Sequence, residues 1–259
     1  MLVSYIRRSD GNRSSSAGTF SRRHEHRGAM ATRSKLSDDV KHLATSLGAD
    51  LVGIAPGKAF ENAPAGHRPK DILKGARSVV VIAVALPNAA IESAPSREYS
   101  ASYMSANNEL NRIAFRLAKF LEEKGHRAVQ VPASPPYDLK RMRGDLSHRH
   151  AGELAGLGAF GKNSLLLSPK YGARMRLVSV ISDADLTPDK KLEIDFCSKC
   201  DICIRACPAK ALEGGGKVDK KACDDQHLRV GKKLDLSGWE QVCGVCLRVC
   251  PVGVDTKKR

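Results

Sequence analysis

The chain has 259 residues, a formal net charge of +15 and few aromatic residues, 5% of the total. This length is enough to bury a core and predicts two domains. No apolar run reaches the ~18–20 residues that a membrane-spanning helix needs. We therefore expect a cytoplasmic protein without membrane partners.

The N-terminal segment is rich in Ser and Arg, poor in acidic residues and without hydrophobic periodicity. Such a composition buries too little apolar surface to fold, so the sequence predicts a disordered basic tail over residues 1–34. An organellar transit peptide has a similar composition. We favour instead a start assigned too far upstream, because Met30 directly precedes the first convincing helix.

Hydrophobic periodicity predicts alternating helices and strands in the following part of the chain. In chain order these are a helix capped by Ser37 and ended by Gly48, a strand over 51–54, a helical turn over 72–76, a strand over 79–86, a helix over 101–123, a strand over 128–131, a loop over 132–136, a short helix ahead of Gly156, and strands over 164–167 and 175–181. This mixture predicts the α+β fold class, with a mixed α/β catalytic and cofactor domain over 35–185. A charged linker over 186–194 follows, and residues 253–259 are expected to fray.

All eight cysteines lie between Cys197 and Cys250, in two near-copies of one spacing. The first copy is Cys-x2-Cys-x2-Cys-x3-Cys-Pro, and the second ends in Cys-x2-Cys-x3-Cys-Pro. This is the bacterial ferredoxin pattern, in which the Cys before Pro binds the other of two [4Fe–4S] clusters. The rule assigns Cys197, Cys200, Cys203 and Cys250 to one cluster and Cys207, Cys223, Cys243 and Cys246 to the second. Residues 195–252 are thus predicted to form a two-cluster, ferredoxin-like domain.

Zinc and disulfides are the alternative uses of these cysteines. Structural zinc sites favour paired knuckles with four ligands per ion, without a third Cys two residues further on. A disulfide framework is disfavoured because the first 196 residues contain no cysteine and no secretory signal is evident.

Two bound clusters would lower the net charge of the folded chain. Residues 1–35 carry eight Arg or Lys against two acidic residues, which leaves +9 on the rest. Each oxidised cluster with its four thiolates contributes about −2, so the body carries about +5, too little to imply nucleic-acid binding by itself.

The glycine loop Gly156-Leu-Gly158-Ala-Phe-Gly161-Lys162-Asn163 contains GxGxxG and also reads G-x4-G-K. Dinucleotide and phosphate-binding loops both require a strand immediately before the glycines. The residues before Gly156 look helical, and Asn163 stands where a phosphate-binding loop needs Ser or Thr. Neither nucleotide interpretation is favoured.

The same loop carries a resemblance to a known family. The run His148-x-His150-Ala, Ala155-Gly-Leu-Gly158-x-Phe-Gly-Lys162-Asn-Ser, then Tyr171-Gly-x-Arg174-x-Arg and Asp183-Ala-Asp-Leu, resembles epoxyqueuosine reductases. The double cysteine pattern follows in the order found in that family. The resemblance covers about 125–252 well and 35–125 loosely.

The resemblance implies a corrinoid-dependent reductase with a nitroreductase-like N-terminal domain, distantly related to reductive dehalogenases. Electrons would pass through two [4Fe–4S] clusters to a cobalamin. Implied partners are a low-potential electron donor of the ferredoxin or flavodoxin type and a tRNA that carries the queuosine modification. The implied cofactor-binding residues are Lys162, Asn163, Ser164 and Tyr171.

One position departs from the family. Epoxyqueuosine reductases carry an Asp proton donor just ahead of the glycine loop, and counting back from that loop places His150 there. Histidine can donate a proton near neutral pH, so His150 is the predicted catalytic acid. A different substrate, or an exposed polar turn holding both His148 and His150, are the competing interpretations. For the whole chain the alternatives are a ferredoxin-like electron carrier without substrate chemistry and a zinc-bearing nucleic-acid-binding protein.

Overall fold

The computed structural model of the chain describes residues 17–136, 138, 140, 143–236 and 242–254, and residues 1–16 of the predicted tail lie outside this range. The helices are α1 (Ala17–Ser46), η1 (Gly57–Phe60, a 3-10 helix), α2 (Pro69–Ile72), α3 (Asn88–Ser93), α4 (Arg97–Glu123), α5 (His148–Leu154), α6 (Ile202–Ala206), α7 (Lys220–Lys233) and α8 (Val245–Arg248). The strands are β1 (Leu51–Pro56), β2 (Ser78–Ala85), β3 (Ala128–Val131), β4 (Ala159–Phe160), β5 (Leu166–Leu167), β6 (Met175–Ser182), β7 (Leu212–Gly214) and β8 (Lys217–Val218). Within these residues, no helix has the length and apolar content to cross a bilayer.

A four-stranded antiparallel sheet in the order β1-β2-β6-β3 forms the centre of the N-terminal body. Strand β2 is a run of mostly β-branched residues, buried over its first six positions. A continuous apolar strand of this kind needs cover on both faces of the sheet, and helices supply it. The expected α+β class is therefore confirmed.

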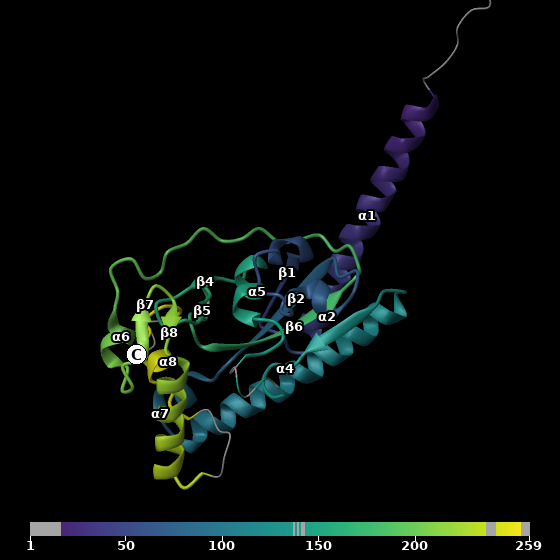
Figure 1. Cartoon of the computed structure of the whole chain (residues 1–259). Coiled ribbons are helices and arrows are strands. Elements are labelled where there is room, and N and C mark those ends of the chain that lie inside the picture. The colour runs from purple at the N-terminus through teal and green to yellow at the C-terminus, as the bar shows by residue number, and fades with distance from the viewer. Residues whose placement is uncertain (1–16, 137, 139, 141–142, 237–241, 255–259) are drawn as a thin grey trace, which may run out of the picture.

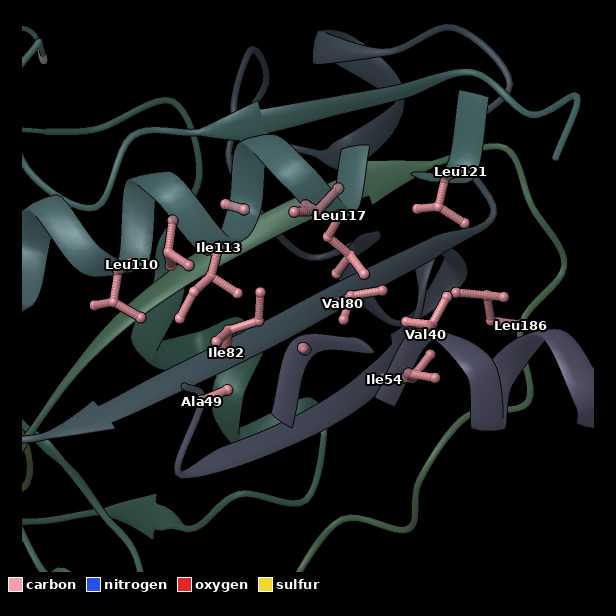
Figure 2. Packing of buried hydrophobic residues seen from close by; sticks show 14 of the residues in the cluster. Val40, Ala49, Ile54, Val80, Ile82, Leu110, Ile113, Leu117, Leu121 and Leu186 are labelled. Carbon is pink, nitrogen blue, oxygen red and sulfur yellow. The ribbon is translucent and has the colours of Figure 1, made fainter. Parts of the chain in front are cut away.

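One face of the sheet is covered by α1 and α4. Leu110, Ile113, Leu117 and Leu121 follow the helical repeat along α4 and are fully buried. Figure 2 shows these side chains pointing toward Val80 and Ile82 of β2. The opposite face is covered by α5 and by the segment that contains η1 and α2.

Helix α1 begins far earlier than the sequence predicts. Residues 17–34 are helical, so the prediction of disorder over 1–34 is wrong for this part. Extending an existing helix avoids the cost of a new nucleus, and Ala, Arg and Met favour the extension. Ser37 is an internal residue of α1 rather than its cap: its hydroxyl donates to the Arg33 carbonyl and accepts from the Thr187 amide. Figure 1 shows the start of α1 projecting away from the sheet.

Strand β3 is shorter than β6, its neighbour. Its four residues pair with Ser179–Ser182. The first half of β6, from Met175 to Val178, therefore lies on β2 alone and has no β3 partner on its other side. Arg176 in this part of β6 donates to Asn107 of α4 and to the Ala133 carbonyl.

The cysteine-bearing segment begins after a long irregular connection from β6. Figure 1 shows this connection as a green coil that runs to α6. The connection is held to the body. The Asp189 carboxylate accepts from the Ile54 amide at 2.9 Å and pairs with Lys41 Nζ at 2.6 Å. Residues 186–194 contain no helix or strand, and Asp189 holds this segment against the body.

Candidate iron–sulfur and reducing site

Four cysteines line one pocket at the junction of the body and the C-terminal segment. They are the set that the spacing rule assigns to one cluster: Cys197, Cys200, Cys203 and Cys250. The rest of the lining comes from Asn163, Leu167, Phe196, Ile202, Pro251 and Val252. No three His, Cys, Asp or Glu side chains of the described part surround a single-ion site. A cubic cluster does not need one, because each of its irons binds one thiolate.

The other four cysteines lie within electrostatic reach of each other. Burial, with smaller contributions from the Cys243 and Cys207 thiols, raises the pKa of Cys223 to about 11. Burial likewise raises the pKa of Cys246 to about 12, with contributions from Cys223 and Cys243. Cys203 of the first set also acts on Cys246, so the two sets adjoin. Iron binds the thiolate form, so cluster binding must displace the thiol protons.

Short helices and turns position the ligands. Cys203 lies in α6, Cys223 in α7 and Cys246 in α8. Asp219 caps α7 by accepting from the Ala222 amide at 3.0 Å. Gly244 precedes α8 with φ +59°, a conformation that favours glycine.

The glycine loop packs against the first pocket. Helix α5 precedes it, so the strand that a nucleotide loop requires is absent from this described segment. A Cβ at Gly158 would stand 2.0 Å from the Leu167 carbonyl oxygen, and one at Gly161 would stand 2.7 Å from the Leu167 side chain. Glycine therefore allows the loop to lie directly on β5, which brings Asn163 and Leu167 to the cysteines.

The predicted cofactor-binding residues do not gather in one place. Asn163 is 4% exposed and lines the pocket of the first cysteine set. Ser164 is buried and receives hydrogen bonds from Arg149 at its carbonyl and, at 3.0 Å, at its hydroxyl. Lys162, which directly precedes Asn163 in the glycine loop, is half-buried.

Tyr171 lies apart from the other predicted cofactor-binding residues. Its hydroxyl donates to the Asp50 carboxylate at 3.1 Å, and its amide donates to Ser168 Oγ at 2.9 Å. The Lys170 ammonium lies 4.7 Å from the centre of its ring. These contacts fix the turn before β6.

His148 is enclosed, contrary to the exposed polar turn considered from the sequence. Its Nε2 lies 2.8 Å from the Pro132 carbonyl oxygen and its Nδ1 lies 2.9 Å from Ser179 Oγ. The carbonyl can only accept, so Nε2 carries the proton and Nδ1 accepts from the hydroxyl. Burial lowers the pKa of His148 to about 4. The imidazole is therefore neutral at physiological pH.

His150 lies on another side of α5 and is accessible. Its Nδ1 lies 2.7 Å from Ser147 Oγ, and its ring centre lies 4.6 Å from that of Phe160. Partial burial lowers the pKa of His150, and the Arg149 charge lowers it further. A lowered pKa makes the imidazolium a stronger acid and reduces its population near neutral pH.

Beside the open edge of β6 lies a group that we call the basic corner, formed by Tyr103, His148, Arg149 and Arg176. The Arg176 guanidinium stacks 4.0 Å from the Tyr103 ring centre and donates to Asn107 Oδ1 at 3.0 Å. Burial, followed by the charge of Arg176, lowers the pKa of Arg149. No carboxylate of the described residues lies within ion-pair distance of either guanidinium.

Tyr99 connects the second cysteine set with the basic corner. Its ring is 2% exposed, and a Cβ at Gly244 would stand 2.7 Å from it, so the ring touches the chain between Cys243 and Cys246. The rings of Tyr99 and Tyr103 lie 6.3 Å apart. Contacts thus run from the second set through two tyrosines to Arg176.

Sequence reasoning missed most of this corner. A signal existed for Arg176, because a charged residue interrupts the apolar strand predicted over 175–181. Tyr99 and Tyr103 gave no comparable signal, since aromatic residues on an amphipathic helix are most often core.

The comparisons with known proteins agree with this arrangement. Residues 196–253 match the family described as the 4Fe-4S double cluster binding domain. The epoxyqueuosine reductase of Bacillus cereus is 27% identical over 256 residues, which cover 84% of this chain and 64% of the relative. The chain resembles epoxyqueuosine reductases. It carries a domain for two [4Fe–4S] clusters at its C-terminal end.

Solved structures show the same fold. An epoxyqueuosine reductase crystallised with an epoxyqueuosine-modified tRNA-Tyr stem loop superposes with a TM-score of 0.62 at 22% identity, covering 85% of this chain and 65% of that one. A reductive dehalogenase whose structure suggests a mechanism for B12-dependent dehalogenation gives a TM-score of 0.68 at 22% identity, covering 87% and 33%. The chain spans about two thirds of the length of the Bacillus cereus relative, 64%.

Proposed function

We propose that this protein is an oxidoreductase of the epoxyqueuosine reductase type, in which electrons pass through two [4Fe–4S] clusters to a corrinoid in the body. The position of the two cysteine sets carries the proposal. One set lines a pocket shared with the glycine loop, and the other touches Tyr99, which leads to the basic corner. Similarity to epoxyqueuosine reductases extends over both parts of the chain.

Two functional units follow from this proposal. Residues 35–185 contain the reducing centre, and residues 195–252 hold the clusters. Cys197, Cys200, Cys203 and Cys250 are the proposed ligands of the first cluster, and Cys207, Cys223, Cys243 and Cys246 those of the second. The first set meets the body at Asn163 and Leu167 and the second meets it at Tyr99, so electrons from a low-potential donor can reach the body through both clusters.

The basic corner has the chemistry to hold a corrinoid, which carries many amide groups and a phosphodiester. Arg149 and Arg176 lack a carboxylate partner among the described residues and can bind the phosphodiester. Ser100 Oγ is a buried atom without a hydrogen-bond partner among the described residues, and it can bind an amide. Ser100 shares a face of α4 with Tyr103. When bound, the corrinoid supplies a low-valent cobalt that carries out the reduction.

His150 is the proposed proton donor. It is the accessible imidazole of α5, whereas the neighbouring His148 is enclosed and neutral. Reducing an epoxide leaves an alkoxide that must be protonated, and an imidazolium near neutral pH can supply the proton.

A tRNA that carries the epoxide is the proposed substrate, in keeping with the names of the relatives. A ferredoxin- or flavodoxin-type protein is the proposed electron donor. The cytoplasm is the proposed compartment, since eight cysteines that act as thiolate ligands need reducing conditions.

The decisive experiment is anaerobic purification of the full chain with iron, cobalt and zinc counted on one sample. We expect about eight irons per chain and no zinc. Added cobalamin should give a bound-corrinoid spectrum that the reduced clusters change, and an epoxyqueuosine stem loop should be converted. Cys246→Ser, which removes one ligand of the second cluster, should bind cobalamin without reducing it. Clusters that accept electrons without corrinoid binding or turnover would instead favour the electron carrier.

The role of His150 has its own test. His150→Gln should lower kcat by roughly 10²–10⁴, the usual contribution of a general acid. His150→Asp should restore part of the rate and move the pH optimum down, because a carboxyl group is protonated only at lower pH. His42→Gln, a change at an exposed position of α1, is the matched control. An unchanged rate and pH profile in His150→Gln would exclude His150 as the donor.

A further inference from the structure

A buried guanidinium lies against the loop that carries Cys250. Arg174, which directly precedes β6, is 3% exposed. Its Nη1 donates to the Cys250 carbonyl at 3.0 Å and lies 3.5 Å from the Val252 carbonyl, while its Nη2 lies 3.4 Å from the Arg248 carbonyl. One side chain of the body thus reaches three carbonyls at the end of α8 and beyond it.

Two glycines hold the same loop in contact with the body. A Cβ at Gly172 would stand 1.8 Å from the Val252 carbonyl oxygen, and one at Gly253 would stand 2.1 Å from the Gly172 amide nitrogen. The two backbones therefore touch and leave no room for water between them. Under this constraint Arg174 cannot turn toward solvent without separating the two segments.

The positive charge of Arg174 beside the Cys250 loop bears on the reduction of a cluster that Cys250 binds. Reduction adds one electron from the donor to a cluster and makes its net charge more negative, and no bond to the protein is broken. A fixed positive charge in a dry, low-dielectric region favours the more negative state. Cluster potentials respond to nearby charge, to hydrogen bonds and to solvent exposure.

We propose that Arg174 is a positioning residue that holds the Cys250 loop and raises the reduction potential of the first cluster. Its guanidinium donates to the backbone of Cys250, a proposed ligand of that cluster, and lies 3.5 Å from the carbonyl of Val252, which also lines the pocket of the four cysteines. The contact with the Cys250 carbonyl ties Arg174 to the first cluster, so the effect on the potential of the first cluster should exceed that on the second. This inference rests on the two-cluster part of the proposed function and is independent of the corrinoid and the substrate.

The test uses two variants of the full chain, purified anaerobically. Arg174→Lys keeps the charge and Arg174→Gln removes it, while both retain an N–H donor in place of the guanidinium. Potentiometric titration followed by electron paramagnetic resonance measures both clusters. At a fixed potential, Arg174→Gln should lower the ratio of reduced to oxidised first cluster roughly tenfold relative to Arg174→Lys, which is about 59 mV for a one-electron couple.

The matched control is Arg205→Gln, which removes a charge from α6 where the side chain is 71% exposed and paired with Asp201. Water screens such a charge, so both potentials should stay unchanged. Equal potentials in Arg174→Gln and Arg174→Lys, with full iron content, would overturn the inference and leave the proposed function intact. If neither variant retains its clusters, Arg174 is a structural brace and the inference is likewise overturned. A wild-type chain that holds no iron would refute the proposed function instead.

Discussion

Three consecutive residues of α5 differ in chemistry because each points in a different direction. Successive side chains on an α-helix are about 100° apart. His148 faces β6 and is enclosed, Arg149 reaches Ser164, and His150 rests against Phe160 with an accessible ring. One short helix therefore supplies a partly buried, hydrogen-bonded imidazole, a cation and an accessible imidazole.

Neutral His148 should make stability depend on pH. Its folded pKa of about 4 lies below the unfolded value of about 6.5, so the unfolded chain binds more protons as the pH falls through this window. The stabilising contribution is complete above pH 6.5 and falls by about 1.4 kcal/mol per pH unit toward pH 4. His148→Gln keeps a donor for Pro132 and removes the titration. Anaerobic urea unfolding at pH 7.0 and 5.5 should show a smaller loss in the variant.

The control for this prediction is His42→Gln, at an exposed position of α1. It should lose stability between the two pH values as the wild type does. If His148→Gln and the wild type have the same pH dependence, His148 is not held neutral by burial.

Residue-level prediction from sequence worked where the pattern is local. The spacing of the cysteines and the prolines after Cys207 and Cys250 sufficed to propose two ligand sets, and the pocket contains the whole first set. The enclosure of His148 could not be seen, because it depends on Ser179, 31 residues away. Arg174 contacts a carbonyl 76 residues later, which no local pattern reports.

The glycine loop shows at the scale of an element how a motif can mislead. Its glycines serve close backbone packing on β5, not a phosphate. Gly158→Ala should therefore destabilise the fold by about 1–3 kcal/mol, the usual cost of overpacking, because its Cβ would stand 2.0 Å from the Leu167 carbonyl oxygen. Gly231→Ala in α7 meets open space and should be neutral or stabilising. Thermal unfolding and iron content measure both. A destabilised Gly231→Ala together with an unaffected Gly158→Ala would contradict this account.

Elements with a strong apolar repeat were predicted well. Strand β3 has the predicted bounds, and β2, β6 and α4 differ by a few residues, because each packs directly on the core. Helix α7 was not predicted, and it has no buried residue to create a repeat. The predicted strand over 164–167 shrinks to β5, since only two of its residues pair with β4.

At the scale of the whole molecule, the two predicted domains are joined by several separate contacts. Arg174 and the glycine pair hold the Cys250 loop, and Tyr99 packs on Gly244. Arg248 of α8 donates to the Ala94 carbonyl. Electron transfer between the parts benefits from such contacts, because they fix the distance between the donor and acceptor. The limits of the domains in sequence stay a prediction.

The connection between the parts offers a test of this joining. Asp189 accepts from the Ile54 amide and its own amide donates to the Ile54 carbonyl, both at 2.9 Å, while its carboxylate pairs with Lys41. Asp189→Ala leaves the Ile54 amide without its partner, which costs about 1–3 kcal/mol. The segment should then open more often, and trypsin should cut after Lys190 roughly tenfold faster, as expected from about 1.4 kcal/mol.

Native-state proteolysis under anaerobic conditions, with the cleavage site identified by mass spectrometry, measures this rate. Asp201→Ala is the control, because it breaks an exposed ion pair with Arg205 and leaves the connection untouched. An unchanged rate after Lys190 in Asp189→Ala would mean that Asp189 does not hold the connection. If cleavage accelerates while both clusters remain, the Cys250 and Gly244 contacts suffice to keep the cluster segment on the body. If the clusters are lost as well, the connection contributes to the docking itself.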